Sequence, residues 1–222
     1  MQAFFKNQNQ NVKKYRSYID TAALLLVLAI GCIWMRHTYE AQQTQRHIAE
    51  KILRFHVRAN SDSAKDQELK LKVRDAVGAY MNRELAEMES LEECTKIAKK
   101  RLPDIIGIAK KTIEIEGYAY PVSANVESVE FPEKTYGEYT FPKGRYQALN
   151  VVIGEGRGHN WWCVMYPNMC FHGAVYEAPD KEAGESLQRV LSEDEYDAVL
   201  KSRKYRVRFK FIEKWNQIFH KK

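Results

Sequence analysis

The sequence lacks three features that would point directly to a class of function. It has no internal repeat and no low-complexity tract, and its formal net charge of +6 is not concentrated in one basic face. Half of that charge falls in residues 1–20, which hold four basic residues and one acidic residue. The other half is spread over the remainder of the chain. Nucleic-acid binding uses a clustered basic surface, so it is not expected here.

Long apolar runs are also scarce, and the clearest one lies near the N-terminus. Thr21 to Met35 is apolar after its first residue, and the basic residues precede it. The positive-inside tendency predicts that the N-terminus stays in the cytoplasm and that Arg36 onward crosses the membrane. No A-x-A cleavage site follows the run, and Cys32 sits in a poor lipoprotein box. A cleaved signal peptide and an uncleaved anchor therefore both stay open.

This segment divides the chain. We expect a basic cytoplasmic N-region at 1–18, a signal or anchor segment at 19–35, a linker at 36–50 and an extracytoplasmic domain at 51–222. That domain is long enough to bury one core.

The periodicity of apolar residues changes along the domain. Residues 52–58 alternate apolar and polar side chains, which predicts a strand. Capping patterns predict helices after Ser63, Ser90 and Ser192, and another helix from Pro103 to Gly117. Further strands are expected at 120–131, 146–153 and 161–166, a loop at 132–144, and a helix in the second half of 204–220. Helices and strands segregate, so the expected fold is α+β, with an antiparallel sheet packed against helices.

Only four cysteines are present. Cys32 falls in the membrane segment, and Cys94 falls in a helical pattern as a core residue. Cys163 and Cys170 flank a short turn. Outside the cytoplasm this turn could close with a disulfide, or the two residues could be buried thiols on neighbouring strands.

The densest motif runs from Ile153 to Phe171 and contains three glycines at alternate positions from 154 to 158. No Lys-Ser or Lys-Thr and no helix follows them, so a phosphate site is not favoured. We interpret the glycines as a special loop that presents His159 and Asn160 between two strands. Trp161 and Trp162 should point to opposite faces of the second strand. One of them could be an exposed binding anchor, or both could be buried.

Catalytic and metal interpretations of this region are weak. His159 and Cys163 lie four positions apart on a strand, about 13 Å, too far for a thiol–base pair. A zinc site from Cys163, Cys170, His159 and His172 matches no compact finger. Asp62, Asp66 and Glu68 could act as acid and base, but they more often cap a helix. No metal or cofactor is expected. Arg206, Arg208 and Lys210 form either a solvated face or a contact with anionic lipid.

Three blocks resemble the stage II sporulation protein R family: LRFHVRANSDSAKDQELKLKVRDAV (residues 53–77), FPEKTYG (131–137) and PKGRYQALNVVIGEGRGHNWWCVMYPNMCF (142–171). The resemblance implies a protein made in the forespore and exported across its cytoplasmic membrane into the intermembrane space, where it stays anchored or is secreted. It also implies a partner, the membrane-embedded aspartic protease of the mother cell, stage II sporulation protein GA. That protease processes pro-sigma factor E. The resemblance supplies no catalytic residues.

We therefore expect a signalling ligand and not an enzyme. The residues predicted to bind the partner are Arg58, Asn60 and Asp62 in one segment and, in another, His159, Asn160, Trp161 and Trp162. Two alternatives stay open. One is an extracytoplasmic enzyme such as a wall hydrolase or thiol enzyme, and the other is a structural anchor of the envelope.

Overall fold

The computed structural model describes residues 2–169 and 181–201, and its contacts divide the chain into two compact units, residues 1–44 and 45–222. Most of helix α1 (Gln2–Ala49) forms the first unit. From Tyr18 this helix is apolar and long enough to cross a membrane, with a mean hydropathy of 2.0 and none of the apolar window buried in the protein. By length and composition it is consistent with a membrane anchor or a signal sequence.

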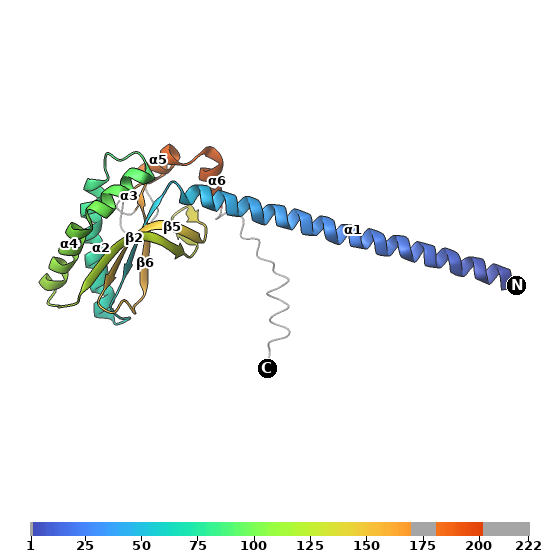
Figure 1. Cartoon of the computed structure of the whole chain (residues 1–222), viewed down its shortest axis with the longest axis horizontal. Coiled ribbons are helices and arrows are strands. Elements are labelled where there is room, and N and C mark those ends of the chain that lie inside the picture. Colours follow the sequence, from blue (N-terminus) through green and yellow to red (C-terminus); the bar gives the residue numbers. More distant parts are fainter. Residues whose placement is uncertain (1, 170–180, 202–222) are drawn as a thin grey trace. The chain divides into compact units, whose positions relative to one another are not determined.

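The second unit is built on a four-stranded sheet in the order β2-β5-β1-β6 (Figure 1). The strands are β1 (Leu53–Arg58), β2 (Val122–Phe131), β5 (Gly144–Ile153) and β6 (Asn160–Tyr166). The pairs β2–β5 and β1–β6 are antiparallel, whereas β1 and β5 are parallel. The α+β class is confirmed, and the sheet is mixed and not wholly antiparallel. Helices, the antiparallel strand β2 and a short hairpin intervene between β1 and β5, so the chain runs in the same direction in these two strands.

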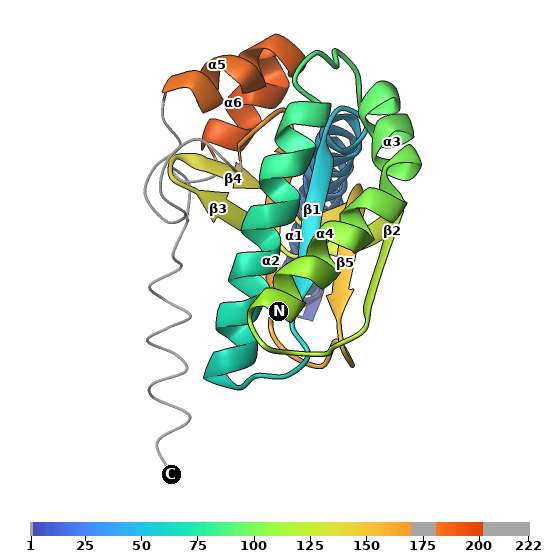
Figure 2. The same cartoon turned by 90° about the vertical axis from the view of Figure 1, so that its left-hand side faces the viewer.

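Three helices cover one face of this sheet: α2 (Ala64–Glu84), α3 (Leu91–Lys100) and α4 (Leu102–Ile115) (Figure 2). Their apolar sides pack on Phe55 and Val57 of β1 in one buried cluster. Ser63 and Ser90 cap α2 and α3 through their side-chain oxygens, as predicted. After α4, Gly117 adopts the left-handed conformation expected of a residue that follows a helix.

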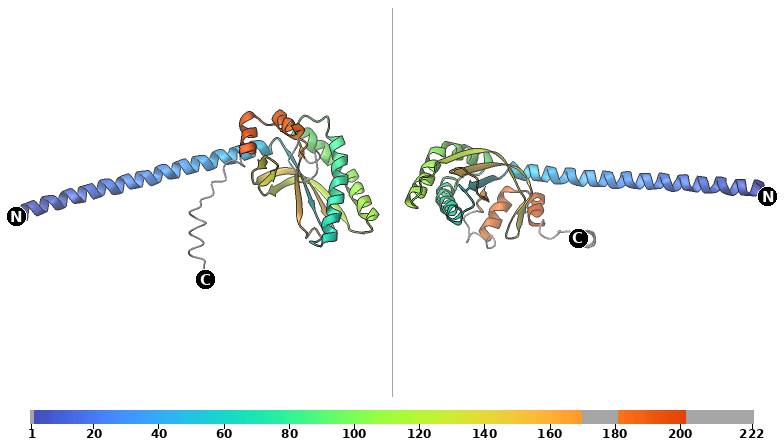
Figure 3. Two further views of the ribbon diagram at one scale, coloured as in Figure 1. Left: turned by 180° about the vertical axis from the view of Figure 1, so that it is seen from behind. Right: turned by 90° about the horizontal axis from the view of Figure 1, so that it is seen from below.

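A second apolar cluster lies on the other face of the sheet. It is formed with the hairpin of β3 (Lys134–Tyr136) and β4 (Tyr139–Phe141), and with α5 (Lys181–Val190) and α6 (Glu193–Lys201) (Figure 3). The prediction of a loop at 132–144 was wrong, because residues 134–136 and 139–141 within this stretch pair as a hairpin. Helix α5 was not predicted, α6 begins after Ser192 as predicted, and the helix expected within 204–220 lies outside the described residues.

The end of α1 belongs to the second unit. Ile48 is fully buried in the second cluster, together with Ile52, which precedes β1. The Gln45 side-chain amide donates a hydrogen bond to the Arg145 carbonyl at 3.4 Å. The chain therefore enters the domain at the N-terminal end of β1. The functional boundaries expected at residues 18, 35 and 50 stay predictions.

Strand β1 is central in the sheet and is covered on both faces. Its apolar residues face α2–α4, while Arg54 and His56 face the second cluster with no exposed surface. Arg54 lies among four aromatic rings, closest to Phe131 at 4.5 Å from the guanidinium carbon to the ring centroid. Burial lowers the pKa of Arg54. The alternation of apolar and polar residues predicted the strand correctly, but both faces of β1 are buried.

Candidate partner-binding surface

The two segments predicted to bind a partner meet where β1 ends and β6 begins. The His159 backbone N–H donates to the Asp62 carboxylate at 2.6 Å, and Nδ1 of the His159 ring contacts the same oxygen. Nε of Arg58 donates to the Asn160 side-chain oxygen at 3.1 Å. We call residues 58–62 and 154–160 together the loop surface. The binding residues were predicted from the sequence in two separate segments, and the structure brings these two segments together.

Asn60 and two glycines hold the loop surface in shape. The Asn60 side-chain oxygen accepts a hydrogen bond from the Glu155 N–H at 3.0 Å. The Asn60 backbone carbonyl accepts one from the Arg157 N–H at 3.1 Å. Gly154 has a φ of +59°, and a Cβ there would lie 2.2 Å from the Asn60 side-chain oxygen. A Cβ on Gly158 would lie 2.1 Å from the Ser61 carbonyl oxygen. The two glycines therefore allow the backbone of the second segment to approach Asn60 and Ser61 of the first segment closely.

Asp66 is buried and holds the first of the two segments in place through hydrogen bonds. Its carboxylate accepts hydrogen bonds from the Asn60 side-chain amide at 2.9 Å and the Ser61 hydroxyl at 2.5 Å. These bonds, with Ser61 as the largest contribution, lower the pKa of Asp66 although it is buried. The predicted capping box is half formed, because the Asp66 N–H bonds Ser63 while its carboxylate turns to the loop. The sequence pattern identified Asp66 as a cap but not as a support for Asn60.

Lys70 holds the second segment, and sequence reasoning missed it. Its ammonium group donates to the His159 carbonyl at 3.1 Å and to the Gln67 side chain at 2.6 Å. Burial, and then the nearby Arg74 charge, lower the pKa of Lys70. Lys70 follows Asp66 by one helical turn, so both project from the same side of α2. That spacing is the one signal in the sequence that could have linked them.

The two tryptophans lie on opposite faces of β6 and are both half-buried. Trp161 meets the edge of Phe55, and the Arg74 guanidinium lies 4.9 Å from its ring centroid. Trp162 stacks on His56 on the other face. Each ring contacts a buried cluster, so each contributes to the fold whatever its role in binding.

The cysteine and metal alternatives find little support in this region. Cys163 is 3% exposed and disulfide-bonded, so its sulfur is not a free thiol. Its predicted partner Cys170, and also His172, lie outside the described residues. Among the residues described, no three His, Cys, Asp or Glu side chains are grouped so that they could hold a metal ion. Cys94 is free and buried, and burial raises the pKa of its thiol to about 12.

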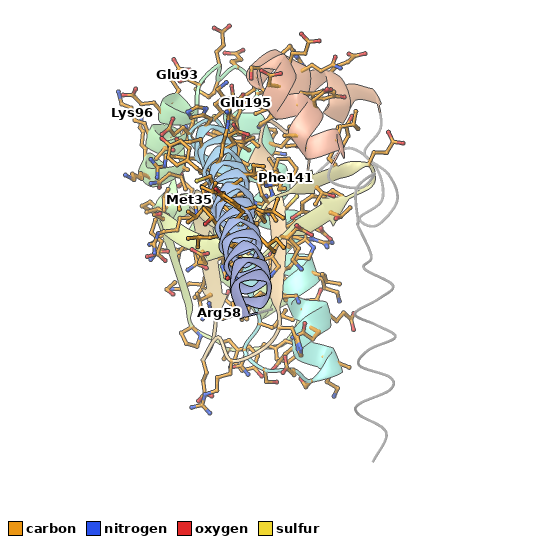
Figure 4. All side chains as sticks on the ribbon, turned by 90° about the vertical axis from the view of Figure 1, so that its right-hand side faces the viewer. Met35, Arg58, Glu93, Lys96, Phe141 and Glu195 are labelled. Atoms are coloured by element: carbon orange, nitrogen blue, oxygen red, sulfur yellow. The ribbon has the colours of Figure 1, made fainter. Side chains whose placement is uncertain are left out.

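The loop surface is exposed and carries charges of both signs. The side chains of His159 and Asp62 are 79% and 55% exposed, and Arg157 pairs with Glu155 at 3.2 Å. Arg58 lies at one end of the sheet, whereas Phe141 and Glu195 lie toward the other end (Figure 4). A cavity of about 580 Å³ is lined by Asn82, Met88, Tyr166 and Arg189, outside the loop surface.

The chain combines an apolar N-terminal helix, which fits a membrane anchor or a signal sequence, with one α+β domain that carries an exposed polar surface. The chain belongs to the stage II sporulation protein R family, whose model matches residues 49–176. Stage II sporulation protein R of Bacillus subtilis (strain 168) is 35% identical over 179 residues, which cover 77% of this chain and 80% of that protein. No solved structure matches the chain. Family membership makes it a sporulation protein.

Proposed function

We propose that this chain is an exported signalling protein of sporulation. In this proposal its domain crosses the forespore membrane and reaches the intermembrane space. There the loop surface binds the membrane-embedded aspartic protease of the mother cell, of the stage II sporulation protein GA type, which then processes pro-sigma factor E. Support comes from the family, the apolar N-terminal helix and the geometry of the loop surface.

The contact of Asp62 with His159 is the observation that carries the proposal. These residues are 97 positions apart, yet Asp62 accepts the His159 N–H and contacts its ring while both side chains stay largely exposed. Buried Asp66 and Lys70 fix the backbone underneath. A preformed surface loses little conformational freedom on binding, which favours recognition of a specific partner.

Within the domain, the loop surface is separate from the point at which the chain enters. The chain enters the domain at the N-terminal end of β1, next to Ile48 and Ile52, whereas Arg58 ends the same strand. The loop surface is therefore at the opposite end of β1 from the connection to α1.

Activation also sets a thermodynamic condition. A ligand shifts its receptor toward an active state only when it binds that state more tightly than the inactive one. The loop surface must therefore contact protease groups that are differently placed in the two states.

A reconstitution of the full chain, the receptor protease and pro-sigma factor E tests the proposal. His159→Ala combined with Asn160→Ala should abolish processing, and Asp62→Asn should reduce it, while the domain stays folded. Lys96→Ala with Lys99→Ala, on the exposed side of α3, is the matched control and should process normally. Trp162→Ala is a poorer probe because that ring also packs on His56. Full processing by the His159 and Asn160 variant would remove the loop surface from the proposal.

An extracytoplasmic hydrolase is the second candidate, and the same pair of residues favours it. A carboxylate that contacts Nδ1 orients a histidine as a general base in many hydrolases. This alternative predicts release of soluble fragments from purified cell wall by the wild-type chain, with loss in His159→Gln. Processing of pro-sigma factor E without release of cell-wall fragments would favour the signalling function over the hydrolase. A thiol enzyme is disfavoured by the disulfide-bonded Cys163.

A further inference from the structure

The outer strands of the sheet differ in how their free edges are covered. β2 and β6 are the two edge strands. The edge of β6 is covered, because the Trp162 carbonyl accepts the Tyr136 hydroxyl at 2.9 Å and the Val164 carbonyl accepts the Met169 N–H at 3.3 Å. For β2, no described residue beyond β5 forms a backbone hydrogen bond with the strand.

The register of β2 against β5 shows which backbone groups face outward. The Gly154 N–H donates to the Pro121 carbonyl at 2.8 Å, so these two residues form a hydrogen-bonded antiparallel pair. Pairs alternate along an antiparallel ladder, and the register is uniform from Val122 to Phe131. The N–H and C=O groups of the even-numbered residues 122 to 130 therefore point away from β5. One of these outward carbonyls, that of Ser128, accepts a hydrogen bond from the Arg145 guanidinium at 3.1 Å.

The free edge of β2 also lacks most of the features that protect against strand addition. Natural edge strands are shortened, bulged, or carry proline or charged side chains, lysine above all. β2 is ten residues long, has no register shift against β5, and contains no proline and no lysine. A long, regular edge of this kind readily accepts another strand.

We propose that the free edge of β2 binds an extended segment of the receptor as a fifth strand of the sheet. The inference rests on the proposed function, since the receptor supplies the segment. β2 begins beside the loop surface, because Pro121 is bonded to Gly154. One receptor could therefore contact both the loop surface and the edge.

Side chains of β2 specify the chemistry of the added strand. On the face of α3 and α4, Val122, Ala124 and Val126 are half-buried and pack at the border of the apolar cluster. Glu127 and Glu130 are exposed, and β2 has no basic residue. A strand with apolar residues beside the valines and basic residues on the opposite face, beside Glu127, would complement both features.

A second copy of the chain is a poorer occupant. Pairing two β2 strands would gather four carboxylates along one seam without a cation from either strand, and like charges across a pair are unfavourable. Residues 205–211 of the chain, YRVRFKF, also alternate apolar and basic residues, but they lie outside the described residues. They are an alternative occupant that the experiment must separate from the receptor.

Proline at an outward position gives a selective test. Ser128 is exposed and its N–H points outward, so Ser128→Pro removes a donor for an added strand and keeps the bonds to β5. Ser128→Ala is the matched control. With receptor purified in detergent, the proline variant should bind about tenfold more weakly, as expected for one lost hydrogen bond. Glu127→Gln with Glu130→Gln should also weaken binding and reduce its salt dependence.

A synthetic ten-residue peptide of alternating valine and lysine tests the edge without the receptor. Added to the full chain in micelles, it should slow hydrogen exchange of the amides at 124, 126, 128 and 130 in wild type and in Ser128→Ala. In Ser128→Pro, which has no amide hydrogen at 128, the amides at 124, 126 and 130 should need about tenfold more peptide for the same protection. No protection by the peptide would overturn the inference. Protection by the peptide, but no receptor binding by wild type, would overturn the proposed function instead.

The other occupants give distinct results. A chain without residues 203–222 should keep the same outward amide exchange as the full chain when no peptide is present. Faster exchange in the shortened chain would assign the edge to residues 205–211 and overturn the inference. Sedimentation that shows a dimer broken by Ser128→Pro would assign the edge to a second copy, with the same consequence.

Discussion

The indole ring of Trp162 lies flat on the imidazole of His56, with ring centroids 4.0 Å apart and planes inclined by 8°. Phe131 approaches the same indole at 4.6 Å, and His56 has no exposed surface. Neither imidazole nitrogen has a hydrogen-bond partner among the described residues. Burial therefore lowers the pKa of His56 from 6.5 to about 4, because the charged form loses its hydration.

This stacked pair predicts a pH-dependent stability. The unfolded chain binds a proton at His56 near pH 6.5 and the folded chain does not until about pH 4, so the neutral form favours folding. The contribution is complete above pH 6.5 and is lost as the pH falls toward 4, by up to about 3 kcal/mol. Urea unfolding between pH 4 and pH 7 should show this slope, and His56→Phe should flatten it. The same slope in His56→Phe would assign it to other groups; His159→Gln, at an exposed site, is the control.

Arg54 predicts an unusual ranking of substitutions. Its guanidinium is fully buried, and its one hydrogen bond to a described residue, from Nη2 to the Tyr136 hydroxyl, is 3.3 Å long. Arg54→Met removes the cost of the buried charge and keeps apolar volume, so the free energy of unfolding should fall by less than about 1 kcal/mol or rise. Arg54→Lys keeps the charge but loses the planar stacking on the rings, and should cost about 2 kcal/mol or more. Chemical unfolding of both variants checks the order, and greater stability of the lysine variant would contradict it.

Local signals in the sequence predicted the helices more accurately than the pairing of strands. Ser63, Ser90 and Ser192 each begin a helix because a cap needs only residues three positions away. Gly117 follows α4 for an equally local reason. The hairpin at 134–141 was missed because its strands have three residues each, too few to show a period.

Pairings and contacts between residues far apart in the sequence could not be predicted from it. The parallel pairing of β1 with β5 depends on how the intervening helices, β2 and the hairpin together return the chain. The contact of Asp62 with His159 joins residues 97 positions apart, so the sequence could name both but not place them together. The burial of Arg54 and His56 was hidden because an alternating strand is usually covered on one face, whereas β1 is covered on both.

Ile48 tests whether the end of α1 is part of the folded domain. It is fully buried in the second cluster, so Ile48→Ala should lower the free energy of unfolding of the domain by about 3 kcal/mol. Ile115 is 73% exposed at the end of α4, and Ile115→Ala should change it by less than about 0.5 kcal/mol. Thermal unfolding of the two variants in the same detergent gives the comparison. Equal stabilities would mean that residues 45–49 act only as a tether.

Gly158 links the shape of the loop surface to its proposed role. A Cβ at this position would lie 2.1 Å from the Ser61 carbonyl oxygen, and Asp66 and Gln67 hold Ser61 in place through hydrogen bonds. Gly158→Ala must therefore push the two segments apart, at a cost of about 2 kcal/mol, and should weaken the contact between Asp62 and His159.

Gly107 provides the matched control, because a Cβ there meets no atom within 4 Å and the residue lies inside α4. Gly107→Ala should stabilise the domain by about 0.5–1 kcal/mol, since alanine loses less backbone freedom in a helix. Thermal unfolding separates the two substitutions, and the NMR signals of the His159 ring report the loop surface directly. If Gly158→Ala leaves those signals and the stability unchanged, the close approach of Ser61 to Gly158 does not set the geometry of the loop surface.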